Sequence, residues 1–328
     1  MSRRLRDSSK NCPGLSEERH RTRAWSYKLT TQPRAGVWAS VVAIMLSFAV
    51  NSIITRYLVS WGFVDPIPLT IIRFVSGLVA LLLLAGLARD RFPRHGLETR
   101  DILGAFFLGA YAFAISFGYV AISAAAGSLV FYSMVVITMG SYSVAVDGEA
   151  LSAKLVASQG LGLMGIFTIT FSGLASVSVL GVALMALTGA SWGLYSAYGK
   201  GFGSYLGYTF NSFLLFGVAG IAIGLLALPF TGTAVWTSIS ARDLALALYM
   251  GTVSTALVYV LWNRVLQRIR ASQGGLVQLL VPVMTGILGV TLLSEAVSPW
   301  LVLGGALILA GIYVNSTRRV ETGALSAP

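Results

Sequence analysis

The 328-residue chain is poor in the side chains that most enzymes use for chemistry, with one cysteine, two histidines and 11% charged residues. Cys12 has no second cysteine to pair with, so an intrachain disulfide is excluded. His20 and His95 lie outside the apolar segments, and no cluster of His, Cys, Asp or Glu has the spacing of metal ligands. These absences predict no metal and no cofactor, and they argue against a membrane-embedded enzyme.

Apolar residues dominate the chain instead. Hydrophobic residues make up 56% of it and its mean hydropathy is +0.79, values that suit stacked membrane spans rather than a soluble domain. A span needs about 20 apolar residues to cross the hydrocarbon layer. We therefore predict an all-α integral membrane protein that crosses the lipid bilayer with ten transmembrane helices. The predicted spans are residues 37 to 59, 66 to 88, 102 to 122, 125 to 146, 153 to 172, 178 to 199, 208 to 228, 242 to 263, 271 to 293 and 299 to 316.

A sequence repeat divides the chain into two halves. Glu149-Ala-Leu-Ser, with Gly165 after it, is echoed by Glu295-Ala-Val-Ser, with Gly311 after it, at a constant offset of 146 residues. The first half, residues 37–172, and the second, residues 178–316, each hold five predicted spans. Because five is odd, the halves would face opposite ways. Inverted repeats of this kind are typical of secondary transporters, which bind substrate near the midplane between the repeats.

The net charge of +11 is distributed as in a membrane protein rather than a nucleic-acid-binding one. Nine of the 23 Lys and Arg residues precede the first span, and in the ten-span topology only Arg56 and Arg242 fall near the outer side. This asymmetry places both termini in the cytoplasm. We expect residues 1–36 to be a disordered basic tail and residues 317–328 to be a second cytoplasmic tail, with no nucleic-acid partner.

Several motifs resemble one known family. They are Pro68-Leu-Thr-Ile-Ile-Arg73-Phe, Ser191-Trp192-Gly193-Leu-Tyr195, the segment from Gly251 to Trp262, and Leu280-Val-Pro282-Val running on to Glu295 and Gly311. Over residues 37–316 the chain resembles the drug/metabolite transporter superfamily, EamA type. The resemblance implies ten spans in two inverted five-span repeats and a carrier for amino acids and related metabolites. Met134-Val-Val and Ser47-Phe48 depart from the family pattern, so the resemblance does not specify one substrate.

Polar and aromatic side chains inside the spans are the candidates for substrate binding, because a polar group facing lipid costs free energy. Tyr111 and Ser128 lie on the same polar stripes. Each candidate could line a cavity or could join helices through hydrogen bonds. The predicted binding set is Asn51, Tyr119, Tyr132, Trp192, Tyr195, Thr255, Tyr259 and Gln278, together with Arg73.

Arg73 is the one ionisable residue that the pattern places well inside a span. It could hold a substrate carboxylate, or its long side chain could reach the outer headgroups or cap neighbouring carbonyls. Glu149 and Glu295 are assigned structural or gating roles, as is Pro282. For the two glutamates we expect capping of the span that follows each in sequence, with gating as the alternative.

The sequence therefore predicts an inner-membrane carrier of small organic metabolites, such as amino acids or amphipathic compounds, that works by alternating access and favours export. It would act as a monomer or homodimer on a small-molecule substrate. A sugar-phosphate or nucleotide-sugar carrier is the alternative, and an enzyme or scaffold is a different class. Since no carboxylate or histidine is predicted at mid-membrane, we expect facilitated diffusion or exchange rather than proton coupling.

Overall fold

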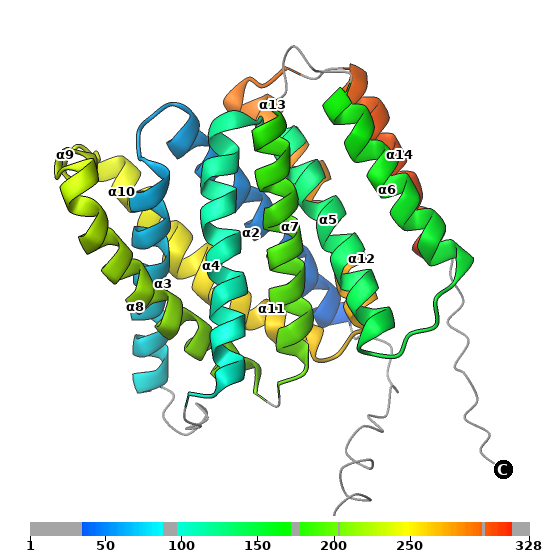
Figure 1. Ribbon diagram of the computed structural model, residues 1–328, viewed down its shortest axis with the longest axis horizontal. Helices are drawn as coiled ribbons and strands as arrows, with labels where there is room; N and C mark the ends of the chain where they lie inside the picture. Colours follow the sequence, from blue (N-terminus) through cyan, green and yellow to red (C-terminus); the bar gives the residue numbers. More distant parts are fainter. Residues whose placement is uncertain (1–34, 88–96, 172–177, 203, 297–298, 317–328) are drawn as a thin grey trace, which may run out of the picture. The chain divides into compact units, whose positions relative to one another are not determined.

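The computed structural model describes residues 35–87, 97–171, 178–202, 204–296 and 299–316, and every regular element in these ranges is a helix (Figure 1). The first predicted half corresponds to α2 (Ala35–Ser60), α3 (Pro66–Leu87), α4 (Thr99–Ala121), α5 (Ala124–Ala145) and α6 (Ala153–Phe171). The second half corresponds to α7 (Val179–Lys200), α8 (Tyr205–Thr231), α9 (Ala234–Thr237), α10 (Ala241–Tyr249), η1 (Met250–Leu257), α11 (Val258–Leu266), α12 (Ala271–Val277), α13 (Leu280–Leu293) and α14 (Pro299–Ser316). Residues 1–34 and 317–328 of the expected tails lie outside the described residues, and the last two residues of the tail predicted at 1–36 already belong to α2.

Serine side chains mark where several of these helices begin. Ser123, Ser178, Ser204 and Ser240 are the N-caps of α5, α7, α8 and α10, and each side chain accepts a hydrogen bond from a backbone N–H of the first turn. Such a cap satisfies one of the donors that the first turn of a helix leaves unpaired. The start of each of these helices is thus indicated by a serine at that point in the sequence.

Eight segments in the described part of the chain are long and apolar enough to cross a membrane, and they match eight of the ten predicted spans. The other two predicted spans coincide with α6 and α14. Residues 153 and 299, where these two helices begin, are again 146 positions apart.

Two predicted spans are less regular than expected. The span over residues 242 to 263 is interrupted by η1, a π-helix, between α10 and α11. The span over residues 271 to 293 breaks at Gln278, where α12 ends and α13 begins two residues later. Pro282 gives the physical reason: it lacks a backbone N–H, so it suits the first turn of a new helix but not the middle of a continuous one.

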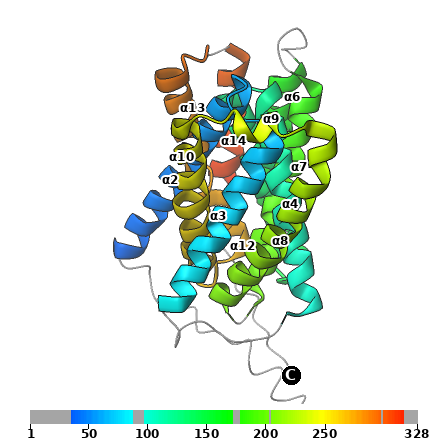
Figure 2. The ribbon, with the colours of Figure 1, turned by 90° about the vertical axis from the view of Figure 1, so that its left-hand side faces the viewer.

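Helices from the two halves pack against each other throughout. From Ala39 onward the chain forms one compact unit, in which α7 lies against both α4 and α5, and α6 lies against α14. The α3 helix contacts α8 and α10 and runs between them (Figure 2). Side chains at the centre of this unit therefore come from both predicted halves.

The turns before the two repeated glutamates have the same geometry. Gly148 and Ser294, 146 residues apart, both have positive φ angles, of 70° and 53°. The next residue in each turn donates its N–H to a carbonyl six positions earlier: Glu149 to Ser143 at 2.9 Å, and Glu295 to Gly289 at 3.2 Å. The sequence repeat is thus matched by a repeat in local backbone structure.

The α6–α14 contact follows the same offset. A Cβ added at Gly165 would collide with the carbonyl oxygen of Gly304, and one added at Gly311 would collide with the carbonyl oxygen of Ser158. Gly165 corresponds to Gly311, and Ser158 to Gly304, after adding 146. The missing side chains let the two backbones approach closely, as expected for packed membrane helices.

Candidate functional site

A buried arginine lies at the centre of the compact unit. Arg73 of α3 is 1% exposed, and its guanidinium contacts three neutral hydroxyl groups. Its Nε donates to Thr255 Oγ1 at 2.8 Å, and its Nη2 donates to the hydroxyls of Tyr111 and Tyr259 at 3.1 Å each. Arg73 therefore does not extend toward the headgroups. It bridges α3 and α4 of the first half to η1 and α11 of the second.

Close backbone packing brings η1 to Arg73. Gly251 lies against α3, and a Cβ added there would overlap Ser76 Oγ and the carbonyl oxygen of Arg73 itself. Gly77 faces η1 in the same way, near the carbonyl oxygen of Gly251. Because both helices lack side chains at this crossing, Thr255 comes within hydrogen-bonding distance of the guanidinium. A π-helix at this position fits the tendency of π-turns to occur at functional sites.

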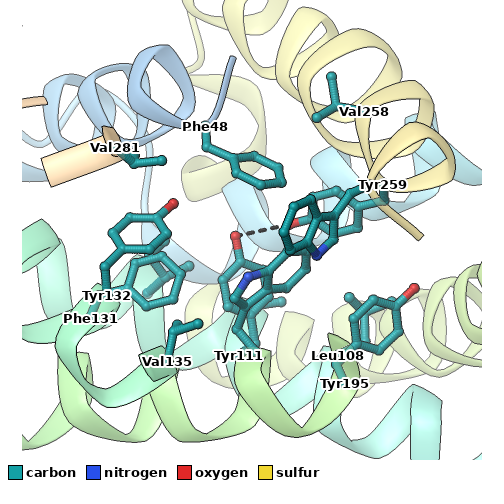
Figure 3. Close-up of a cluster of buried hydrophobic side chains, with 14 of the residues drawn as sticks. Phe48, Leu108, Tyr111, Phe131, Tyr132, Val135, Tyr195, Val258, Tyr259 and Val281 are labelled. Atoms are coloured by element: carbon teal, nitrogen blue, oxygen red, sulfur yellow. Dashed lines mark hydrogen bonds between the residues drawn. The ribbon is translucent and has the colours of Figure 1, made fainter. Parts of the chain in front are cut away.

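Aromatic rings surround the arginine and the two tyrosines. The ring centroid of Trp192 lies 4.6 Å from that of Tyr259 and 5.1 Å from that of Tyr111, and Phe48 packs edge-on to Trp192 at 5.6 Å. Figure 3 shows the labelled rings of Phe48, Tyr111 and Tyr259 facing a common interior region, with a dashed line for the 2.9 Å hydrogen bond between the tyrosine hydroxyls. We call Phe48, Arg73, Tyr111, Trp192 and Tyr259 the central cluster.

Gln278 links the central cluster to the break between α12 and α13. Its Oε1 accepts a 2.6 Å hydrogen bond from Trp192 Nε1, and its Nε2 donates to the carbonyl of Gly274 at 3.2 Å. Asn51 joins α2 to η1, since Ser254 donates its hydroxyl to Asn51 Oδ1 at 3.3 Å. Both predicted binding amides thus join helices in this conformation, where each is at most 3% exposed.

The remaining predicted residues lie around this centre at different positions. Tyr195 stacks on Trp192 and on Tyr208, and its hydroxyl accepts from Asn263 at 3.4 Å. Tyr132 is buried and packs on Phe131, with ring centroids 4.2 Å apart. Tyr119 is also buried, but it lies farther along α4, where its carbonyl accepts from Arg56. The structure therefore groups Arg73, Trp192, Tyr195, Thr255, Tyr259 and Gln278 and leaves Tyr119 outside that group.

Glu295 caps a helix that its position in the sequence does not predict. Its carboxylate accepts hydrogen bonds from Ala124 N at 2.7 Å and Ala125 N at 3.3 Å, which are the first residues of α5. Arg56 of α2 lies 3.4 Å from the same carboxylate. Glu295 thus caps a helix of the first half, because the fold brings that N-terminus closer than sequence order suggests.

At the opposite end of α5, acidic groups of the first half meet basic groups of the second. Glu149 Oε1 lies 3.8 Å from Arg270 Nη1, and Arg270 is the N-cap residue of α12. Asp147 Oδ2 lies 3.0 Å from Lys200 Nζ at the end of α7. Each repeated glutamate is therefore placed at the start of a helix in the other half, at opposite ends of the compact unit.

Sequence reasoning missed two features. In the sequence Phe48 stands out only as a departure from a family pattern, yet it packs against Trp192, Tyr259 and Trp262. Asp101 was placed outside the spans, but α4 begins at Thr99 and Asp101 is fully buried, with Oδ2 accepting from Asn211 at 3.0 Å. A capping-box position before an apolar run was the available signal for Asp101.

Comparison with known proteins agrees with this architecture. Residues 179–317 match the model of the EamA-like transporter family. An uncharacterized protein of Pseudomonas aeruginosa, PA1977, is 34% identical over 277 residues, which cover 82% of this chain and 93% of that protein. A protein of Clostridium kluyveri described as an uncharacterized transporter is 23% identical, over 84% of this chain and 91% of its own length. A solved structure titled "Crystal structure of protein" aligns over 86% of this chain and 97% of its own with a TM-score of 0.63, and at 22% identity it supports the fold alone.

These findings define the class of protein. A chain with several membrane-spanning helices and a family match of this kind is a multi-pass membrane transporter. The chain belongs to the EamA-like transporter family, within the drug/metabolite transporter superfamily.

Proposed function

We propose that the protein is an inner-membrane carrier of small organic metabolites that works by alternating access between residues 37–172 and residues 178–316. The observation that carries this proposal is the position of Arg73: it belongs to the first half, and two of its three hydrogen-bond acceptors, on Thr255 and Tyr259, belong to the second. A buried polar site between two repeats is where carriers of this architecture bind substrate.

The proposed membrane arrangement is ten spans in two inverted repeats, with both termini in the cytoplasm. The matching turns at Gly148 and Ser294 and the reciprocal glycine contacts of α6 and α14 support a repeat in three dimensions. The basic residues support the orientation. Export is the direction favoured by the resemblance to metabolite exporters.

Ion pairs between the halves are the proposed gates. In this topology Arg56 and Glu295 lie at the outer end, and Glu149 and Arg270 at the inner end. With both sets formed, Arg73, Trp192 and Tyr259 are each at most 2% exposed, so the conformation corresponds to a closed, occluded stage of the cycle. Opening one set at a time would expose the central cluster to one side of the membrane.

The central cluster favours an organic metabolite over a nucleotide sugar or sugar phosphate. Arg73 is its one cation among the described residues, whereas a multiply charged phosphate would require several cations. Aromatic rings with a few hydroxyls and amides suit an aromatic or amphipathic body.

Chemical cross-linking of the gates tests the mechanism. In a Cys12→Ser background, cysteines at Arg56 and Glu295 would be joined by a short reversible thiol cross-linker, and the same would be done at Glu149 and Arg270. Either cross-link should stop transport of solutes from a radiolabelled amino-acid and organic-acid panel in proteoliposomes, and reducing it should restore transport. Full transport with both ends cross-linked would contradict alternating access.

A further inference from the structure

Arg73 carries a positive charge that no described acidic side chain neutralises. The three groups that accept its hydrogen bonds are neutral hydroxyls, and none of the four described ion pairs includes it. Two buried aspartates in the described helices have other partners: Asp101 bonds Asn211 and Asp243 bonds Ser240. A cation within a membrane protein that is not paired with an anion is costly to maintain and marks a functional site.

The hydrogen-bond pattern leaves donors available for an anion. Tyr111 accepts at its hydroxyl oxygen from Arg73 Nη2 and from Tyr259, so its own O–H donates to no described residue. The Nη1 group of Arg73 likewise donates to no described residue, since the bonds described run from Nε and Nη2. A guanidinium edge beside a phenolic O–H is a suitable set of donors for a carboxylate.

The hydroxyls of Tyr111 and Tyr259 accept hydrogen bonds from Arg73 in a way that a substrate could replace. Tyr111 is on α4 of the first half and Tyr259 on α11 of the second, and each contributes one acceptor to Nη2. If the halves separate during the transport cycle, Arg73 loses an acceptor while it becomes accessible. A substrate carboxylate could then take the place of the hydroxyl, and reclosure would bury the resulting ion pair.

We propose that Arg73 binds the carboxylate of a singly charged organic anion and that the rings of Phe48, Trp192 and Tyr259 hold its aromatic or branched apolar body. This inference rests on the proposed carrier function and narrows its substrate class. A monoanion makes the closed site electrically neutral. A zwitterion would leave one net positive charge buried, and a dianion one net negative charge, so both bind less well.

Phenylacetate, phenylacetamide and phenylalanine form a matched set of probes. They share a benzyl group but present a monoanion, a neutral amide and a zwitterion. Binding to the purified full-length protein would be followed by the rise in thermal melting temperature. We expect phenylacetate to bind the wild-type protein about 10- to 100-fold more tightly than either of the others, the ratio typical of a charge-assisted hydrogen bond.

Variants separate the anion site from general effects on folding. Arg73→Gln should lose the preference for phenylacetate over phenylacetamide. Tyr111→Phe, which keeps the ring and removes one donor, should weaken phenylacetate binding by about tenfold. Arg242→Gln is the matched control, because Arg242 stacks on Tyr57 outside the central cluster; it should leave the preference intact.

The outcomes distinguish this inference from the carrier proposal. Equal binding of phenylacetate and phenylacetamide by the wild-type protein would overturn the anion site. The anion site would also be overturned if the Tyr111→Phe variant and the Arg73→Gln variant both kept the wild-type preference for phenylacetate over phenylacetamide. In either case, transport of an amino acid or other solute in proteoliposomes would leave the carrier function standing. A wild-type protein that neither binds nor transports any solute of the panel would contradict both.

Discussion

The Glu295 carboxylate lies 3.4 Å from Arg56 and accepts hydrogen bonds from the first two backbone amides of α5. The glutamate and α5 belong to different predicted halves. A negative charge at a helix N-terminus is stabilising because it meets both free N–H groups and the positive end of the helix dipole. This contact therefore holds the two halves together at one end of the central cluster.

Neutralising Glu295 should open that end. In Glu295→Gln the charge-assisted bonds to Arg56 and α5 are weakened by about 1.5 kcal/mol, which shifts the open-to-closed ratio by about tenfold. A cysteine at the buried Ser128, one turn inside α5, should then react faster with an impermeant maleimide added outside. Glu98→Gln is the control, since Glu98 forms a half-exposed ion pair with Arg100. Equal labelling of the Ser128 cysteine in Glu295→Gln and Glu98→Gln would show that Glu295 does not act as a gate.

The Glu149→Gln variant should have the opposite sidedness. Glu149 contacts Arg270 at the other end of α5, so its neutralisation favours the inner-open form. A cysteine at the buried Ala197, near the end of α7, should label faster in inside-out vesicles, while Ser128→Cys labelling from outside should not rise. If both glutamate variants increased labelling at the same end, the two ends would not alternate.

The tyrosine hydroxyls around Arg73 should matter more than those farther away. Tyr259→Phe removes one acceptor of Arg73 and the donor to Tyr111, so substrate affinity in a transport assay should change by about tenfold. Tyr132→Phe is the matched control, because Tyr132 packs on Phe131 and is not a partner of Arg73. Similar effects of the two substitutions would show that the contact with Arg73 has no special role.

Much of the architecture could be predicted from sequence because its causes are local. Apolar runs of spanning length gave the helices, and serine caps such as Ser178 fixed some of their starts. The partners of Arg73 could not be predicted, since Thr255 and Tyr259 are more than 180 residues away in sequence. The contact of Glu295 with the start of α5 could not be predicted for the same reason, because sequence order does not determine which N-terminus lies nearby in space.

Irregular helix geometry was the other feature that could not be predicted from the sequence. Pro282 was visible in the sequence, but the break at Gln278 and the π-turn at η1 depend on how these helices pack against their neighbours. Gly251 permits the contact with α3 that positions Thr255, and an isolated glycine in an apolar run does not reveal such a partner. The candidate set therefore contained Arg73 and its acceptors Thr255 and Tyr259, but the sequence did not show that they pair.

The membrane topology can be tested independently of transport. In the Cys12→Ser background, a cysteine at the exposed Ser238 should be labelled by an impermeant reagent from outside, and one at the exposed Lys154 should not. This follows from the excess of basic residues expected on the cytoplasmic side. The reverse labelling pattern would invert the orientation and exchange the assignments of the outer and inner gates.

Counterflow in proteoliposomes tests the central claim most directly. Vesicles loaded with an unlabelled solute from the amino-acid and organic-acid panel would be diluted into a trace of the same radiolabelled solute, with no pH gradient. A carrier exchanges one for the other, so at least one solute should accumulate transiently above its equilibrium level, and Arg242→Gln should behave like the wild type. The account would be contradicted if no solute showed this overshoot although the vesicles contained folded protein. In that case the time course would be the same as in protein-free liposomes.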